Sequence, residues 1–176
     1  MSHLMYLASD RAISPHPNPH ERSLSVNQAL EMGLEVPAHL LAPGIDRDWE
    51  GAVHWSDRSV HIDLDSGCVE DGDYADDFAL LPLYPVADVH TSLPFRLEIS
   101  CRWTLDRANA ILDYLRSQME KGYQLELWSV YQGGGRPRII RYEAEAGSFT
   151  AEDLLEISQL PTWEGCPVHH CVTIRW

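Results

Sequence analysis

The stretch that decides the fold class is residues 95–131, which read FRLEISCRWTLDRANAILDYLRSQMEKGYQLELWSVY. Its first part, residues 95–102, alternates apolar and polar side chains, which is the period of a strand with one face in water. Thr104 then stands where a helix N-cap is favoured. Apolar residues recur at spacings of three and four from Leu105 to Met119, and the end of the stretch is rich in aromatic and aliphatic residues. The stretch therefore predicts a strand, an amphipathic helix and a second strand.

We expect this helix to be long, covering about 105–121, with Gly122 as the residue that closes it. Two short helices are predicted elsewhere, each from a capping box, in which a hydroxyl and a side chain three residues later bind free N–H groups. One follows Ser25 and the other follows Thr150. The helices are therefore spread along the chain and separated by strand-like segments.

Further strands are predicted on both sides of the central stretch. They are expected at residues 4–8, 52–64, 138–144 and 168–176. Residues 78–86 form at best an edge strand, because Pro82 and Pro85 cannot donate to a ladder. A turn with three glycines precedes 138–144, so this strand is predicted to form a hairpin with the strand before it. The polar, acidic segment 66–77 is predicted to be a surface loop.

The order of these elements is typical of a single α+β domain over residues 1–176. We expect one mostly antiparallel or mixed sheet, with the long helix packed on one face. No run of the chain approaches the roughly 18 apolar residues that cross a bilayer, so no membrane partner is expected. The first ten residues lack the basic flank and apolar run of a signal peptide, which favours a cytoplasmic protein.

The charge of the chain restricts its partners. The net charge is −14, and residues 46–77 hold eleven carboxylates and two arginines, a local net charge of −9. Such a field repels phosphate backbones, so nucleic-acid binding is not expected. The same field favours fast encounter with a basic protein. Solubility alone is the competing explanation of the charge.

We therefore predict a partner-binding surface within residues 63–77. The chain has no recognisable nucleophile elbow or phosphate loop, which favours a non-enzymatic binding protein. Acidic immunity proteins and antitoxins of bacteria, which block a basic toxin, are the class we expect. The candidate partner-binding residues are its seven carboxylates: Asp63, Asp65, Glu70, Asp71, Asp73, Asp76 and Asp77.

A second hypothesis is a metal-dependent hydrolase. Cys166-Pro-Val-His169-His170-Cys171 resembles half of a zinc site, because thiolate and imidazole suit that ion. In a strand, His169 and Cys171 share one face. The predicted metal ligands are His61, Cys166, His169 and Cys171, and the hydrolase would add Asp63 and Asp65, with a bound water as nucleophile. Core cysteines beside partly exposed histidines explain the same pattern without a metal. No cofactor is predicted for the binding protein.

A third hypothesis is a small-molecule sensor with a pocket lined by tryptophan. The chain has six tryptophans, at positions 49, 55, 103, 128, 163 and 176. A place in the core or at its rim is the usual role of this side chain.

Two strings near the ends of the chain are MYLASDR at 5–11 and SFTAEDLLE at 148–156. They resemble small bacterial proteins of uncharacterised function, which also carry a strand–helix–strand unit like 95–131. Such proteins often have a cysteine- and glycine-rich stretch in the middle, where this chain has only Ser66-Gly67-Cys68. The resemblance implies a bacterial source and no particular activity.

Overall fold

The computed structural model describes residues 2–57, 60–62, 69–71, 74–83, 90–133 and 135–176. Two compact units are distinguished by their internal contacts. The larger unit is Met1–Pro17 with Tyr74–Trp176, and the smaller unit is Asn18–Asp73. The expectation of one domain over 1–176 stays a prediction, because two compact units can belong to one domain.

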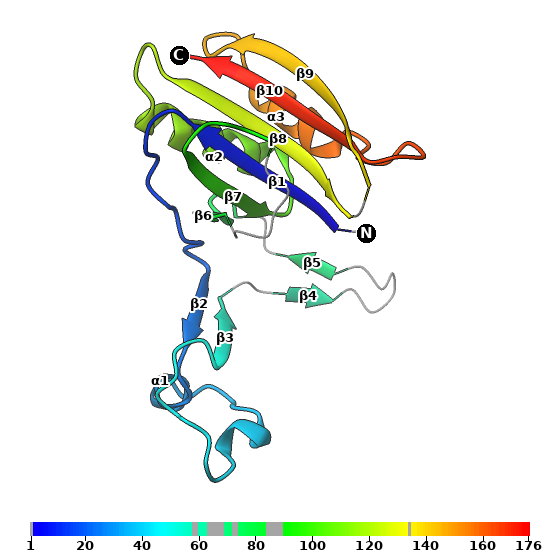
Figure 1. Cartoon of the computed structure of the whole chain (residues 1–176). Helices are drawn as coiled ribbons and strands as arrows, with labels where there is room; N and C mark the ends of the chain where they lie inside the picture. Colours follow the sequence, from blue (N-terminus) through cyan, green and yellow to red (C-terminus); the bar gives the residue numbers. More distant parts are fainter. Residues whose placement is uncertain (1, 58–59, 63–68, 72–73, 84–89, 134) are drawn as a thin grey trace. The chain divides into compact units, whose positions relative to one another are not determined.

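The larger unit is built on a six-stranded sheet with the order β6-β7-β1-β8-β10-β9 (Figure 1). Neighbouring strands are antiparallel except β10 and β9, which are parallel. The α+β class and the mixed sheet predicted from the sequence are therefore confirmed. The strands are β1 (Ser2–Ser9), β6 (Phe78–Pro82), β7 (Phe95–Cys101), β8 (Gln124–Gln132), β9 (Arg138–Glu145) and β10 (Val168–Arg175).

Two helices, α2 (Leu105–Gln118) and α3 (Ala151–Gln159), pack against one face of this sheet (Figure 1). The main core joins buried residues of both helices, such as Ile111 and Leu154, to residues of the central strands, such as Leu7 and Leu127. Burial of these large apolar side chains supplies the main driving force for the layer. None of the helices in the described parts of the chain is long and apolar enough to cross a membrane.

The helix caps follow the predicted chemistry, but α2 is shorter than expected. The Thr104 side chain accepts a hydrogen bond from the backbone of Arg107, and α2 then runs for 14 residues. Met119 already has extended backbone angles, with φ −103° and ψ 139°. Gly122, with φ +93°, therefore serves the turn into β8 and does not close the helix as predicted. A helix of 14 residues is of ordinary length rather than long.

The predicted hairpin between β8 and β9 is wrong. Strand β10 lies between them, antiparallel to β8 and parallel to β9. The chain leaves β9, forms α3 and returns in β10, which is the crossover that parallel neighbours require. The physical reason is burial: β10 is buried at most positions and needs a neighbour on each side, whereas β9 is mostly exposed and occupies the edge.

The edge position of β6 agrees with the prediction for residues 78–86, because β6 is the first strand of the sheet. Pro82 is the residue that ends it, where the lost amide donor costs least. The predicted strands at 4–8 and 168–176 correspond to β1 and β10.

The smaller unit contains two short ladders, β2 (Glu21–Leu24) with β3 (Val53–Ser56) and β4 (Val60–Ile62) with β5 (Val69–Asp71). The sequence did not predict β2. Strands β3 and β4 lie within the predicted strand at 52–64, and β5 lies within the predicted loop at 66–77. Residues 58–59, 63–68 and 72–73 of these two segments lie outside the described residues. Helix α1 (Val26–Glu31) starts with the predicted capping box of Ser25 and Gln28. A single helical turn at Ala38–Leu41 follows it.

Candidate functional site

The predicted acidic surface is only partly described. Asp63, Asp65 and Asp73 lie outside the described residues. Glu70 and Asp71 belong to β5, where Asp71 pairs with Val60 and Glu70 pairs with His61 in the backbone ladder. The role of this surface in binding therefore stays a prediction.

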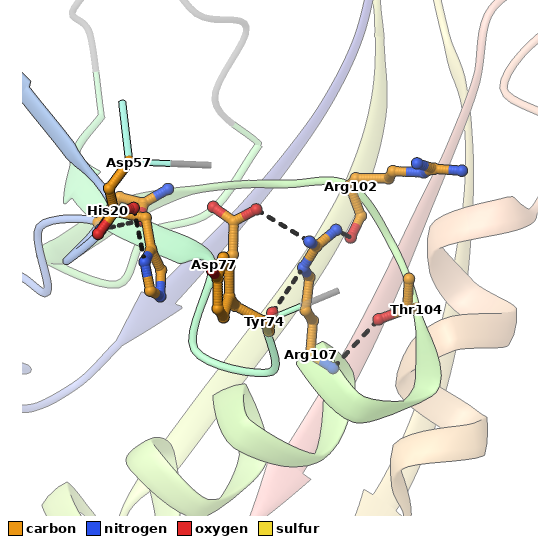
Figure 2. A network of polar contacts seen from close by, with 8 residues as sticks. His20, Asp57, Tyr74, Asp77, Arg102, Thr104 and Arg107 are labelled. Carbon is orange, nitrogen blue, oxygen red and sulfur yellow. Dashed lines mark hydrogen bonds and ion pairs between the residues drawn. The ribbon is translucent and has the colours of Figure 1, made fainter. Parts of the chain in front are cut away.

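Two further predicted residues, Asp76 and Asp77, lie in the larger unit, and only Asp76 is exposed. Asp77 is 4% exposed, and its carboxylate accepts a hydrogen bond from the Arg107 guanidinium at 2.9 Å. Arg107 also donates to the carbonyl oxygens of Tyr74 and Arg102, each at 3.1 Å (Figure 2). The contact between Asp77 and Arg107 therefore holds the turn before β6 against α2. Because Asp77 is buried, it is not part of the proposed binding surface.

The four predicted metal ligands occupy three places in the fold. His61 lies in β4 of the smaller unit, and Cys166 is exposed in the loop before β10. Only His169 and Cys171 share an element, β10. Within the described residues, no group of three or more His, Cys, Asp or Glu side chains is placed to hold a metal ion. Zinc binding stays a prediction.

His169 and Cys171 take part in a buried cluster on the face of the sheet opposite to α2 and α3. At its centre is Trp128, whose ring stacks on Tyr6 with centroids 5.8 Å apart and an interplanar angle of 7°. The His90 ring lies 5.9 Å from Trp128 and 4.8 Å from His169. The alternation of side chains along β10 predicted that His169 and Cys171 share one face of the sheet. The sequence also predicted partly exposed histidines, whereas His169 is 1% exposed.

Polar side chains surround the edge of this cluster. The Trp128 indole N–H donates to Glu126 at 2.9 Å, and the Arg141 guanidinium lies 3.5 Å from the same carboxylate. Arg141 also lies 4.9 Å from the centre of the Trp128 ring and donates to the Cys171 sulfur at 3.4 Å. Sequence reasoning missed Glu126 and Arg141, because nothing local places β9 and β8 on either side of β10.

The ionisable side chains of this cluster have the properties of buried core residues. Burial raises the pKa of the Cys171 thiol to about 12, with a further contribution from the Glu126 carboxylate that Arg141 opposes. A thiol with so high a pKa is protonated at neutral pH, and the protonated form is a poor nucleophile. Burial also raises the pKa of the Tyr6 hydroxyl well above its usual range. The cluster therefore does not provide an activated thiol or phenol.

A groove of about 390 Å³ lies between β9 and α3. Its buried lining is apolar and includes Phe149, Ile157 and Val172. Its exposed lining includes Tyr142 and the carboxylate-bearing Glu156. A binding partner would thus meet an apolar floor with an acidic margin.

The groove lies in a second concentration of negative charge. Residues 142–160 contain five carboxylates and no lysine or arginine. Two of them have local partners: Glu143 lies 3.2 Å from Arg175, and Asp153 accepts a hydrogen bond from the Thr150 backbone at 2.8 Å in the cap of α3. This run of acidic residues is visible in the sequence, but its place beside a groove depends on the parallel pairing of β9 and β10.

Comparison with known proteins gives no family for this chain. No protein-family model, no curated protein and no solved structure matches it. Function is therefore inferred from the residues and the fold alone.

Proposed function

We propose that this protein is a non-enzymatic binding protein whose acidic surface engages a basic polypeptide, in the manner of an immunity protein or antitoxin. The observation that carries the proposal is the groove between β9 and α3, which combines buried apolar side chains with an acidic margin. Apolar burial at the centre and polar contacts at the rim are the usual anatomy of a protein interface. A basic segment would bury apolar side chains against Phe149 and Ile157 and place a cation near Glu156.

The charge of the whole chain supports the same partner. Acidic residues concentrate in 46–77 and in 142–160, and the net charge is −14. A field of this sign steers a basic partner toward the protein and raises the association rate at low salt. Because salt screens the field over roughly 10 Å at 0.1 M, the rate should fall steeply as ionic strength rises.

Capture from the native host tests the proposal. The protein is purified gently from that host and its mass is measured under native conditions. We expect a discrete complex with a polypeptide of basic composition. A partner of acidic or neutral composition, or a chain that is recovered alone after cross-linking in cells, would contradict the proposal.

Charge reversal then tests whether the acidic surface makes the contact. We expect Glu156→Lys, at the margin of the groove, to slow association of the captured partner by about tenfold at low salt. Asp113→Lys is the matched control, because it makes the same change of charge on the exposed side of α2, where the Asp113 side chain is 76% exposed. Equal slowing in both variants would show that only net charge matters and that the groove has no special role.

A further inference from the structure

Strand β9 leaves one edge of the sheet open. It pairs with β10 along its whole length, from Arg138 opposite Val168 to Glu145 opposite Arg175. It is also the last strand in the order of the sheet, and no strand within the described residues pairs with its other side. Native proteins often block such an edge with a proline, a bulge or charged side chains of one sign. The eight residues of β9 contain no proline, keep a continuous register and carry two arginines and two glutamates, which balance in charge.

The direction of the free backbone groups of β9 follows from two hydrogen bonds that it makes toward β10. The amides of Arg138 and Ala146 each donate toward β10 or its flanking residues at 2.9 Å. Successive residues of a strand direct their N–H and C=O groups to opposite sides. The N–H and C=O groups of Ile139, Arg141 and Glu143 therefore face the open edge. These three residues offer a template for another strand.

The two faces of β9 differ in chemistry. Tyr142 and Ala144 line the groove beside α3, whereas Arg141 lies over Trp128 on the opposite face. A strand added next to β9 would extend both faces, since side chains of paired strands lie side by side. Every second side chain of that strand would enter the groove, where the floor is apolar and Glu156 lies at the margin.

We propose that β9 is a docking edge, to which an extended basic segment of the partner adds as a further strand beside the groove. The inference rests on the proposed function and names the place and the form of the contact. Backbone hydrogen bonds to Ile139, Arg141 and Glu143 would supply affinity, and the groove would select apolar and basic side chains.

A second copy of this chain is a less suitable occupant of the edge. Antiparallel pairing of two β9 strands brings Arg141 of one copy opposite Glu143 of the other, which is locally favourable. Each copy nevertheless carries a net charge of −14, so two copies repel one another overall. A basic segment meets attraction from the same charge.

A proline on the open edge isolates the backbone contribution. Glu143→Pro removes an N–H that faces outward and leaves the bonds to β10 in place, which is the position that an edge strand tolerates. Glu143→Gln is the matched control, because it removes the same charge, and with it the ion pair with Arg175, but keeps the N–H. The probe is a fluorescent peptide of eight residues, the length of β9, in which arginine alternates with valine. A second peptide carries N-methyl groups on alternate amides and cannot pair as a strand.

Binding is measured by fluorescence anisotropy and by hydrogen exchange of the β9 amides. We expect the alternating peptide to bind the wild-type chain, to protect the amides of Ile139 and Arg141, and to bind Glu143→Pro about tenfold more weakly. Glu143→Gln should stay within about threefold of wild type, and the methylated peptide should bind at least about tenfold more weakly. Circular dichroism is used to check that both variants fold.

Three outcomes would overturn the docking edge. One is equal affinity for Glu143→Pro and Glu143→Gln, and another is no binding of the alternating peptide to wild type. The third is a dimer in sedimentation equilibrium that Glu143→Pro dissociates, because a second copy would then occupy the edge. The proposed function is decided separately by the captured host partner, so a basic partner that binds Glu143→Pro normally would leave that function standing while excluding this edge.

Discussion

Replacement of Asp77 by alanine should destabilise the larger unit without touching its exposed acidic surface. Asp77 and Arg107 form a buried ion pair at 2.9 Å, and their side chains are only 5% and 2% exposed. Alanine leaves the guanidinium buried without its counter-charge. The two carbonyl oxygens of Tyr74 and Arg102 remain as hydrogen-bond acceptors for it.

The magnitude follows from the burial of the pair. Removal of one partner of a buried ion pair costs about 3–5 kcal/mol of stability. Because two carbonyl contacts to Arg107 remain, we expect Asp77→Ala to cost about 3 kcal/mol, the lower end of that range. For a protein of this size, that corresponds to a fall in Tm of roughly 6–12 °C. The double variant Asp77→Ala/Arg107→Met also removes the buried cation and replaces it with an apolar chain of similar length. It should recover about half of the loss or more.

The assay is urea unfolding followed by far-ultraviolet circular dichroism, with Asp113→Ala as control. Because the Asp113 side chain is 76% exposed and its contact with Arg116 is a surface pair, its replacement should change the free energy of unfolding by about 0.5 kcal/mol or less. A cost below about 1 kcal/mol for Asp77→Ala, or a double variant less stable than Asp77→Ala, would refute the reasoning.

Three further predictions follow from other contacts. Because burial raises the pKa of the Cys171 thiol from 9.0 to about 12, the stability it contributes is complete below pH 9.0 and is lost as pH rises toward 12. Urea unfolding across that range should show a decline that Cys171→Ala makes shallower, and an unchanged slope would contradict this. Thr150→Ala should cost about 1 kcal/mol in thermal unfolding and Thr150→Ser much less, because the hydroxyl caps α3. If the zinc hypothesis is right, elemental analysis will find about one zinc ion per chain. The Cys166→Ser/His169→Ala variant should lose it, and a metal-free wild type would exclude the hypothesis.

The elements that could be predicted from the sequence are those whose signals are local. Thr104 caps α2 and the capping boxes at Ser25 and Thr150 start α1 and α3, because each cap needs only residues three positions apart. Strand β7 could likewise be predicted, because its apolar and polar residues alternate strictly. The end of α2 could not, since Gly122 satisfies a helix stop as well as the later turn that it actually serves.

Strand order could not be predicted, because it depends on residues far apart in the chain. The glycine-rich turn before β9 is compatible with a hairpin, and nothing near it shows that β10 takes the place beside β8. The difference lies in the total burial of each strand, since Cys171 and Ile174 of β10 are fully buried while Tyr142 of β9 is 41% exposed. Burial of this kind is a property of the assembled sheet.

The candidate site residues also divide into those that local sequence could predict and those that it could not. The shared face of His169 and Cys171 could be predicted from the two-residue period of a strand. The pairing of Asp77 with Arg107 could not, because 30 residues separate them and both are charged residues that are usually exposed. The acidic run at 142–160 is plain in the sequence, but only the crossover through α3 turns it into the margin of a groove.

The insertion of β10 between β8 and β9 has a kinetic consequence. Ribosomes make β8 and β9 first, so these strands are available to each other before residues 168–175 exist. A β8–β9 hairpin formed across the glycine-containing turn in that interval would have to open before β10 could enter. In that case, synthesis slowed between β9 and β10 would prolong the non-native pairing and increase aggregation.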